Sequence, residues 1–373
     1  MSKPLKLSRA IGVNILAVII ASSVILSGTA YYYGWYAPQQ QQQQQNLLTL
    51  FGLPIGGSVN ILTAGSLQGV LTTAAQEFEA LHPGVNIYIT SAGSIDCANR
   101  IKQGQPCDLF FSADFYVIKN MLYQTPIPSF PVVNYTDWWV DFATNTLCIA
   151  YSPTAIPLTN TTWYTALSTG YDNGQKVTWA RANPDQDPCG YRTLIMLNIS
   201  DTYYPDHSSE YPGYPVNPSN SSQGILLSEV ESKPSPSWIT VAAKSANIIA
   251  LLQANELDYG IVYESNANQS GLNYVALPDN VSLGYQPYNA WYSQFSVTPT
   301  TTTYQGSWIQ YGATIPNTAQ NRYWAIEFLK FVLSPLNGQA ILKAGSQPTI
   351  NPPIADGVWG NVPPEIQNVS VEA

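Results

Sequence analysis

The sequence predicts an α/β protein of two lobes, and three observations support this fold class. The chain has 373 residues, more than one hydrophobic core usually holds, which favours two units of roughly 100–200 residues each. Strand-like runs pass repeatedly into helix-like patterns between 58 and 122, as in the βαβ units of a mainly parallel sheet. The later segments alternate in the same way, so we expect α/β structure throughout the body.

Three N-terminal stretches share one design, a β-branched run that reaches a serine and continues as a helical pattern. They are SVNILTAGSL (58–67), VNIYITSAGSI (85–95) and DLFFSADFYVIKNML (108–122). Ser66, Ser94 and Ser112 therefore lie beyond the carboxyl ends of predicted strands. Ligands of α/β sheets collect at that edge, which makes these serines candidate site residues.

Further strands and helices follow in alternation. We expect strands at 142–153, 176–183 and 259–264, helices at 191–197, 237–258 and 337–345, and a strand, a turn and a helix across 312–335. Residues 199–236 are dense in Pro, Ser, Tyr and Asn without periodicity, which predicts a long surface excursion. With the crossing between lobes inside 142–153, lobe I is 58–143 and 306–373, and lobe II is 144–305.

A membrane anchor is predicted within residues 1–36. Three cations precede the apolar run 10–30, and the aromatic run 31–36 follows it like an interfacial belt. A cleaved signal peptide is the alternative, since a small-residue cleavage site ends at Ala30. The apolar run exceeds a typical signal core of about 7–15 residues, so we expect an uncleaved anchor. A Gln-rich linker (37–57) would then hold the body at the outer face of the cytoplasmic membrane.

The composition disfavours several classes of function. The net charge of −9 is spread over few ionisable groups without a Lys/Arg cluster, so we expect no nucleic-acid partner. The two histidines, His82 and His207, have no zinc-type spacing to a cysteine. We therefore expect no cofactor and no His-dependent enzyme.

Export has two further sequence signals. Seven glycosylation sequons occur, which predict a glycoprotein: Asn134, Asn160, Asn198, Asn220, Asn268, Asn280 and Asn368. Of the four cysteines, Cys97 and Cys107 would close a short loop if oxidised, and the state of Cys148 and Cys189 is open.

Two Ala-Gly-Ser corners, 64–66 and 92–94, are candidate anion sites. A helix start carries unpaired N–H groups and a partial positive charge, and glycine lets the backbone approach a ligand closely. In a purely structural role, Ser66 and Ser94 would be N-caps worth about 1 kcal/mol each. Because the corner is repeated, we expect both to face one oxyanion.

The motif NPDQDPCGYR (183–192) is predicted to be another helix start, with Asp187 as N-cap before Pro188. Cys189, Gly190 and Tyr191 would then present free N–H groups to an anion. A dianion about 4 Å from the Asp187 carboxylate would be repelled by about 8 kcal/mol at an effective dielectric near 20. Asp187 would therefore cap the helix and point away, be protonated, or bond directly to the metal of the oxyanion.

These segments together resemble the archaeal tungstate/molybdate-binding proteins of ABC importers. The resemblance covers most of residues 57–355 and is carried by AGSL (64–67), HPGVNIYITSAGS (82–94), DLFFSADFYVI (108–118), ANPDQDPCGYR (182–192), ELDYGIVY (256–263) and the segment 311–342. It implies a class II periplasmic-binding-protein fold, the "Venus flytrap", that closes on an oxyanion between its lobes. It also implies delivery of the oxyanion to an ABC transporter permease.

Carried over residue by residue, the resemblance implies that Ser66 and Ser94 contact the oxyanion and that Asp187 completes a six-coordinate metal centre. The family's second carboxylate aligns with Ser245, so either the anion stays tetrahedral or Glu256 or Glu264 substitutes. The predicted oxyanion-binding residues are Ser66, Leu67, Ser94, Asp187, Cys189, Gly190, Tyr191, Ser245 and Tyr263.

Tungstate or molybdate is the first expectation, and the protein is expected to be a monomer. Loss of a carboxylate could open the site to sulfate, with Lys244 nearby favouring anions. A sugar or peptide ligand is the alternative suggested by 25 tyrosines and ten tryptophans. An enzyme is disfavoured because neither serine lies in a G-x-S-x-G elbow, and a purely structural surface protein would not need three aligned helix starts.

Overall fold

The structure is a computed structural model that describes residues 56–160, 162–206 and 236–373. The predicted anchor, most of the linker and the excursion from 207 lie outside these residues. Within the described ranges, no helix is long and apolar enough to cross a membrane. The described residues within 58–78 and 86–373 form one compact unit, and the site described below lies in it.

The first large sheet has seven strands in the order β18-β17-β6-β16-β3-β1-β2. The strands are β1 (Gly57–Ala64), β2 (Val85–Ala92), β3 (Leu109–Ser112), β6 (Trp138–Thr144), β16 (Gln310–Thr314), β17 (Thr349–Gly357) and β18 (Val371–Glu372). β1 runs parallel to β3, whereas β16 is antiparallel to β3 and β6. The sheet is therefore mixed, and the expectation of a mainly parallel sheet is wrong for its second half.

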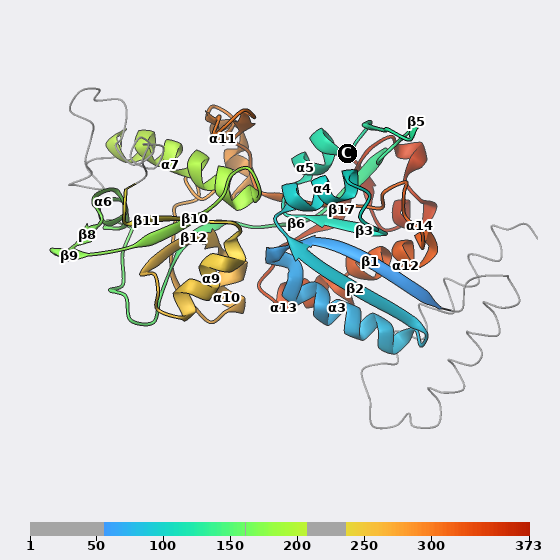
Figure 1. Cartoon of the computed structure of the whole chain (residues 1–373), viewed down its shortest axis with the longest axis horizontal. Helices are drawn as coiled ribbons and strands as arrows, with labels where there is room; N and C mark the ends of the chain where they lie inside the picture. Colours follow the sequence, from blue (N-terminus) through green and yellow to red (C-terminus); the bar gives the residue numbers. More distant parts are fainter. Residues whose placement is uncertain (1–55, 161, 207–235) are drawn as a thin grey trace, which may run out of the picture. The chain divides into compact units, whose positions relative to one another are not determined.

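Helices cover both faces of this sheet. Figure 1 shows α4 and α5 on one face and α3, α12 and α13 on the other. The helices are α3 (Gln68–Leu81), α4 (Ser94–Lys102), α5 (Phe115–Met121), α12 (Arg322–Leu333), α13 (Gly338–Ala344) and α14 (Pro364–Gln367). The ring of Phe78 on α3 packs edge-on against Phe328 and Phe331 on α12, with centroids 5.3 and 5.5 Å away. This aromatic cluster fixes two distant helices on one face.

The second large sheet has five strands in the order β11-β10-β12-β7-β13. They are β7 (Leu147–Tyr151), β10 (Trp179–Ala182), β11 (Ile239–Ala242), β12 (Tyr259–Tyr263) and β13 (Asn273–Ala276). β10 is parallel to β11 and β12, and β7 is antiparallel to β12 and β13. Parallel strands thus form one half of the sheet and antiparallel strands the other.

Two helices pack on opposite faces of β12. They are α7 (Pro188–Asp206) and α9 (Ser245–Gln253), and they are followed along the chain by α10 (Glu264–Gln269). A side chain at Gly260 would come within 2.3 Å of Ile248 on α9, whereas the Cys189 thiol on α7 donates to the Ile261 carbonyl. Figure 1 shows the five-stranded sheet between these two helices.

The expected single strand at 142–153 is two strands that belong to different sheets. β6 ends at Thr144 and β7 begins at Leu147. The intervening Asn145 is buried, and its side-chain amide contacts the hydroxyls of Ser265 on α10 and Tyr311 on β16. The chain therefore changes sheet at this residue rather than extending one strand.

Two other expectations are wrong in part. Residues 237–258 are not one helix, because Ile239–Ala242 form β11, paired along its length with β10. The helix predicted at 191–197 continues to Asp206, so the excursion does not begin at 199. The added turns are held by buried aromatic side chains, with Trp163 donating from its indole to the Tyr204 hydroxyl at 3.1 Å.

Short elements complete the described part of the chain. The 3₁₀ turns are η1 (Gly65–Leu67), η2 (Gln286–Tyr288) and η3 (Trp359–Asn361). The short helices are α6 (Trp163–Thr169) and α11 (Asn289–Tyr292). The two-stranded ribbons are β4 (Pro126–Ile127) with β5 (Phe130–Asn134), β8 (Tyr171–Asp172) with β9 (Gln175–Lys176), and β14 (Ser296–Val297) with β15 (Tyr304–Gln305).

The buried carboxylate of Asp108 links β1 to the segment that precedes α12. Its two oxygens accept from the backbone N–H groups of Asn60, Gln320 and Asn321 at 2.7–2.8 Å. A carboxylate can accept on both sides, whereas an amide has a donor on one side.

We predict that Asp108→Asn lowers the free energy of unfolding by about 2–4 kcal/mol, because at least one backbone donor is left unsatisfied. Urea unfolding measures the change, with the exposed Asp279→Asn as control. Equal stability of the two variants would contradict this assignment.

Candidate functional site

Four helical segments that follow strands of the two large sheets have predicted site residues at or next to their starts. Ser66 lies in η1 after β1, and Ser94 is the first residue of α4 after β2. Asp187 directly precedes α7, and Ser245 is the first residue of α9 after β11. Both serines of the first sheet are buried, with 2% and 0% of their surface exposed.

The two Ala-Gly-Ser corners lie against the helix starts of the five-stranded sheet. A Cβ atom on Gly93 would come within 2.0 Å of the Gln186 carbonyl oxygen and 3.2 Å of the Asp187 Cα atom. A Cβ atom on Gly65 would lie 3.5 Å from the Ala246 side chain on α9. Only glycine allows the approach at 93. The structure therefore brings Ser66, Ser94, Asp187 and Ser245 into one neighbourhood.

Asp187 ties two helix starts together. Its Oδ1 accepts from the Cys189 N–H at 2.9 Å, and its Oδ2 accepts from the Ser245 N–H at 2.8 Å and from the Ser245 hydroxyl at 3.2 Å. Burial raises the pKa of the Asp187 carboxyl, while the hydrogen bonds from Ser245 and Cys189 lower it. Of the three expectations for this residue, the contacts support the helix cap.

The N–H groups expected to be free on α7 are in use. The Cys189 N–H donates to the Asp187 side chain, and the Gly190 N–H donates to the Asp187 carbonyl at 2.8 Å. The Ser245 hydroxyl likewise gives its proton to Asp187. This end of the site is satisfied internally, which corrects the expectation that Cys189 and Gly190 present free donors.

Ser66 and Ser94 are not N-caps, which corrects their expected structural role. The cap positions are Ala64 and Gly93, without side-chain cap bonds. The Ser94 hydroxyl oxygen instead accepts from the Ala113 N–H at 2.9 Å. A backbone N–H can only donate, so the Ser94 proton is not used in this bond. Among the described residues, no acceptor takes that proton.

Tyr263, at the end of β12, has the same arrangement. Its hydroxyl oxygen accepts from Nη1 of Arg192 at 2.9 Å. A guanidinium has no acceptor, so the tyrosine proton is also left over within the described part of the chain. Burial raises the pKa of the Tyr263 phenol well above its ordinary value, which keeps that proton in place.

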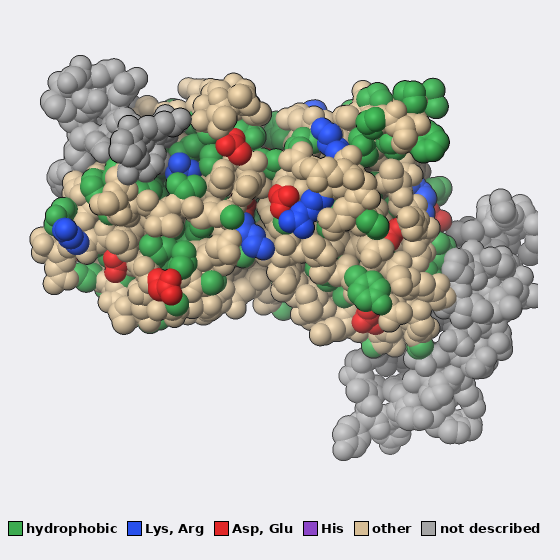
Figure 2. Space-filling view, in the orientation of Figure 1, with side chains coloured by type: hydrophobic (Ala, Val, Ile, Leu, Met, Phe, Trp, Pro, Cys, Tyr) green, Lys and Arg blue, Asp and Glu red, His purple; other side chains and the backbone are tan. Residues whose placement is uncertain are grey.

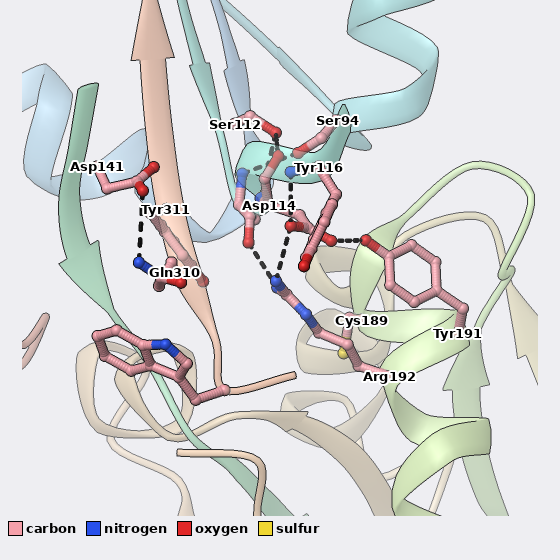
Figure 3. Close-up of polar contacts among 12 residues, drawn as sticks. Ser94, Ser112, Asp114, Tyr116, Asp141, Cys189, Tyr191, Arg192, Gln310 and Tyr311 are labelled. Carbon is pink, nitrogen blue, oxygen red and sulfur yellow. Dashed lines mark hydrogen bonds and ion pairs between the residues drawn. The ribbon is translucent and has the colours of Figure 1, made fainter. Parts of the chain in front are cut away.

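A buried ion pair joins the two sheets beside these hydroxyls. Arg192 on α7 lies 3.3 Å from Oδ1 of Asp114, which caps α5, and its Nη1 donates to the Ala113 carbonyl at 2.5 Å. Tyr191 donates its hydroxyl proton to the same carboxylate. Figure 3 shows Arg192 and Tyr191 both directed at Asp114. Against the opposing effect of burial, the charge of Asp114 raises the pKa of Arg192.

These contacts form one continuous chain. It runs from Ser94 through Ala113 and Arg192 to Tyr263, whose ring centroid lies 5.8 Å from that of Tyr311. Tyr311 in turn donates to the Ser66 oxygen at 2.9 Å. Sequence reasoning missed the roles of Arg192, Asp114 and Tyr311. The arginine of the NPDQDPCGYR motif was the one available signal.

The remaining predicted residues have plainer positions. Leu67 is fully buried, and the Tyr191 ring stacks on Tyr304 with centroids 4.0 Å apart. Lys244 donates to the Ser91 carbonyl at 3.4 Å. Glu256 is exposed and follows the C-terminal end of α9, whereas Ser245 is the first residue of that helix, so Glu256 does not take the place of the missing carboxylate of the resembled family.

The described residues contain no cluster of acids, histidines and cysteines that could hold a metal ion. All four cysteines are buried free thiols, and burial raises the pKa of Cys97 to about 12. Lys and Arg side chains occur only as small separate groups on the face drawn in Figure 2. This face offers no extended basic surface to a polyanion.

Comparison with known proteins gives one consistent picture. Residues 59–346 match the family model described as bacterial extracellular solute-binding protein. An uncharacterized solute-binding protein of Methanoculleus marisnigri is 31% identical over 326 residues, which cover 83% of this chain and 86% of the relative. The molybdate/tungstate-binding protein WtpA of Thermococcus kodakarensis is 29% identical, covering 83% and 86%.

A solved structure supports the fold. The periplasmic molybdate-binding protein of Azotobacter vinelandii superposes with a TM-score of 0.51 at 17% identity, covering 78% of this chain and 98% of that protein. The fold is thus the mixed α/β, two-domain fold of periplasmic binding proteins. The resemblance inferred from the sequence motifs is confirmed at the level of the family.

We predict that Arg192→Met lowers the free energy of unfolding by about 3–5 kcal/mol, because it leaves the buried Asp114 carboxylate without its countercharge. Adding Asp114→Asn should restore part of this loss. Urea unfolding is the measurement. Arg100→Met is the control, since its partner Asp96 is 39% exposed and such a pair contributes about 0–1 kcal/mol. Equal losses in Arg192→Met and Arg100→Met would contradict the role of the buried pair.

Proposed function

The chain belongs to the family of bacterial extracellular solute-binding proteins, and from this premise we propose that its solute is a tetrahedral oxyanion, tungstate or molybdate before sulfate. The observation that carries the proposal is the set of buried hydroxyls at the strand ends. Ser94 and Tyr263 each accept a hydrogen bond from a group that can only donate. Each therefore has a proton left for a guest that only accepts.

An oxyanion is such a guest. A fully deprotonated tetrahedral anion presents only acceptor oxygens, so it matches a site that offers O–H and N–H donors. The first N–H groups of α4, beginning at Ser94, have no acceptor within their own helix. They add donors and the positive end of the helix dipole. A sugar would need acceptors as well as donors from the protein.

The electrostatics of the site fit an anion held without a free cation. Arg192 is paired with Asp114, and the Asp187 carboxylate is bound to the starts of α7 and α9. The pair is neutral overall, and the donors around Asp187 spread its negative charge. Hydrogen bonds rather than an unpaired positive charge would therefore hold the guest.

For Asp187 we propose the capping role, with the anion bound by hydrogen bonds and its metal remaining tetrahedral. All three of its hydrogen bonds come from residues of its own sheet's helices. The second carboxylate that the resembled family uses is replaced by Ser245, which donates to Asp187 instead. A bond from Asp187 to the metal is the competing arrangement.

The choice of anion rests on the names of two relatives. WtpA of Thermococcus kodakarensis and of Pyrococcus abyssi are named molybdate/tungstate-binding proteins. We propose the same ligand class here, and delivery to an ABC transporter permease at the outer face of the cytoplasmic membrane. Site residues from both lobes, Ser66, Ser94 and Tyr263 among them, would surround the anion.

Titration calorimetry of the full chain tests the proposal. The panel is tungstate, molybdate, sulfate, an oligosaccharide and a short peptide. We expect saturable heat with tungstate and molybdate and a weaker or absent response to sulfate. Heat with the oligosaccharide or the peptide, and none with tungstate or molybdate, would overturn the proposal.

We predict that Ser94→Ala weakens tungstate binding by about 1–3 kcal/mol, because a charge-assisted hydrogen bond is lost. The matched control is Ser168→Ala. Ser168 is also buried, but its hydroxyl only donates to the Thr165 carbonyl of its own helix. Calorimetry of both variants checks this. The same affinity in Ser94→Ala as in the control would remove Ser94 from the binding site.

A further inference from the structure

Ser66, the other serine of the site, is linked to a buried residue at the crossing between the sheets. Its hydroxyl oxygen accepts from Tyr311 on β16 at 2.9 Å. The Tyr311 oxygen in turn receives Nδ2 of Asn145 at 2.9 Å. Asn145 lies between β6 and β7, where the chain passes from one sheet to the other. All three side chains are at most 2% exposed.

The orientation of the Asn145 amide follows from its neighbours. Its Oδ1 receives the backbone N–H groups of Thr146 at 3.0 Å and Ser265 at 3.4 Å, and these groups can only donate. Its Nδ2 lies 2.7 Å from the Ser265 hydroxyl and 3.3 Å from Oε1 of Gln347, and the amide nitrogen of Gln347 is used on the Thr144 carbonyl. Turning the Asn145 amide over would place its NH2 group against two backbone N–H donors and its oxygen against the acceptor Oε1 of Gln347.

This orientation decides where each proton lies. An amide NH2 group cannot accept a proton, so Tyr311 cannot donate to Nδ2 of Asn145 and directs its own proton at Ser66. Burial raises the pKa of the Tyr311 phenol, so the phenol remains protonated. The Ser66 oxygen is then an acceptor toward Tyr311, and its proton points elsewhere. No described residue accepts it.

We propose that Asn145 and Tyr311 are positioning residues that fix the Ser66 hydroxyl as a donor to the bound anion. The inference rests on the proposed oxyanion function and adds a coupling to it. The residue at which the chain changes sheet determines whether one ligand-binding hydroxyl can donate. Neither Asn145 nor Tyr311 needs to touch the anion.

A double-mutant cycle on tungstate affinity tests this coupling. Ser66→Ala and Tyr311→Phe should each weaken binding about 5- to 30-fold. The double variant should be no weaker than Ser66→Ala alone, since Tyr311 acts only through Ser66. Tyr259→Phe is the control, because that buried tyrosine donates to the Ile156 carbonyl instead. A structural role for Tyr311 would give effects that multiply, which would overturn the proposal.

Asn145→Asp provides a second variant that keeps the shape of the side chain. A carboxylate accepts where the amide donated, so the Tyr311 proton would turn toward position 145 and Ser66 would have to donate to Tyr311. We expect a loss of tungstate affinity at least as large as in Ser66→Ala. The added negative charge weakens tungstate binding equally with and without the Ser66→Ala substitution. A double-mutant cycle of Asn145→Asp and Ser66→Ala therefore removes the contribution of the charge. A loss smaller than that of Tyr311→Phe would contradict the relay.

Neutron crystallography of the anion-free protein reads the proton positions directly. The Tyr311 deuterium should lie on the line to the Ser66 oxygen, and an Asn145 amide deuterium on the line to Tyr311. A Tyr311 deuterium directed at Asn145 would refute the relay even if tungstate binds. If the wild-type chain binds no oxyanion of the panel, the proposed function fails, while the neutron map still decides the relay.

Discussion

A buried hydroxyl has one proton to give, and in this protein the fixed donors beside each hydroxyl determine where that proton can go. The Ala113 N–H, the Arg192 guanidinium and, through Tyr311, the Asn145 amide occupy acceptor positions of three hydroxyls. The fold supplies each donor from a different place: a strand end, a helix face and the crossing between sheets. Together they leave a set of donors that an oxyanion can satisfy and that the described part of the protein does not satisfy itself.

The carboxylates near these hydroxyls are engaged in structural bonds. Asp187 holds the starts of α7 and α9, and Asp114 caps α5 while it pairs with Arg192. A loose carboxylate would repel the proposed dianion by several kcal/mol, whereas one that accepts from helix N–H groups has its charge spread over these donors. Membership of the solute-binding family and this arrangement of charge point to the same use of the site.

Local sequence patterns were sufficient for the parts of the fold and site that depend on local chemistry. The strand-to-helix units at β1, β2 and β3 and the helix start at Asp187 follow from β-branched runs, apolar spacing and an Asp-Pro pair. The strand at Ile239–Ala242 cannot be predicted from periodicity, because it depends on pairing with β10, which the local pattern does not encode. The partners of Ser66 could not be predicted either, because Tyr311 is 245 residues away along the chain.

The crystal structure of the full chain with bound tungstate tests the central claim most directly. The account predicts a tungsten atom with four oxygens only, and tungstate oxygens within about 2.5–3.0 Å of the hydroxyls of Ser66, Ser94 and Tyr263. It also predicts that Asp187 keeps its bonds to Cys189 and Ser245. Tungstate bound elsewhere, or an Asp187 oxygen bonded to a five- or six-coordinate tungsten, would contradict it.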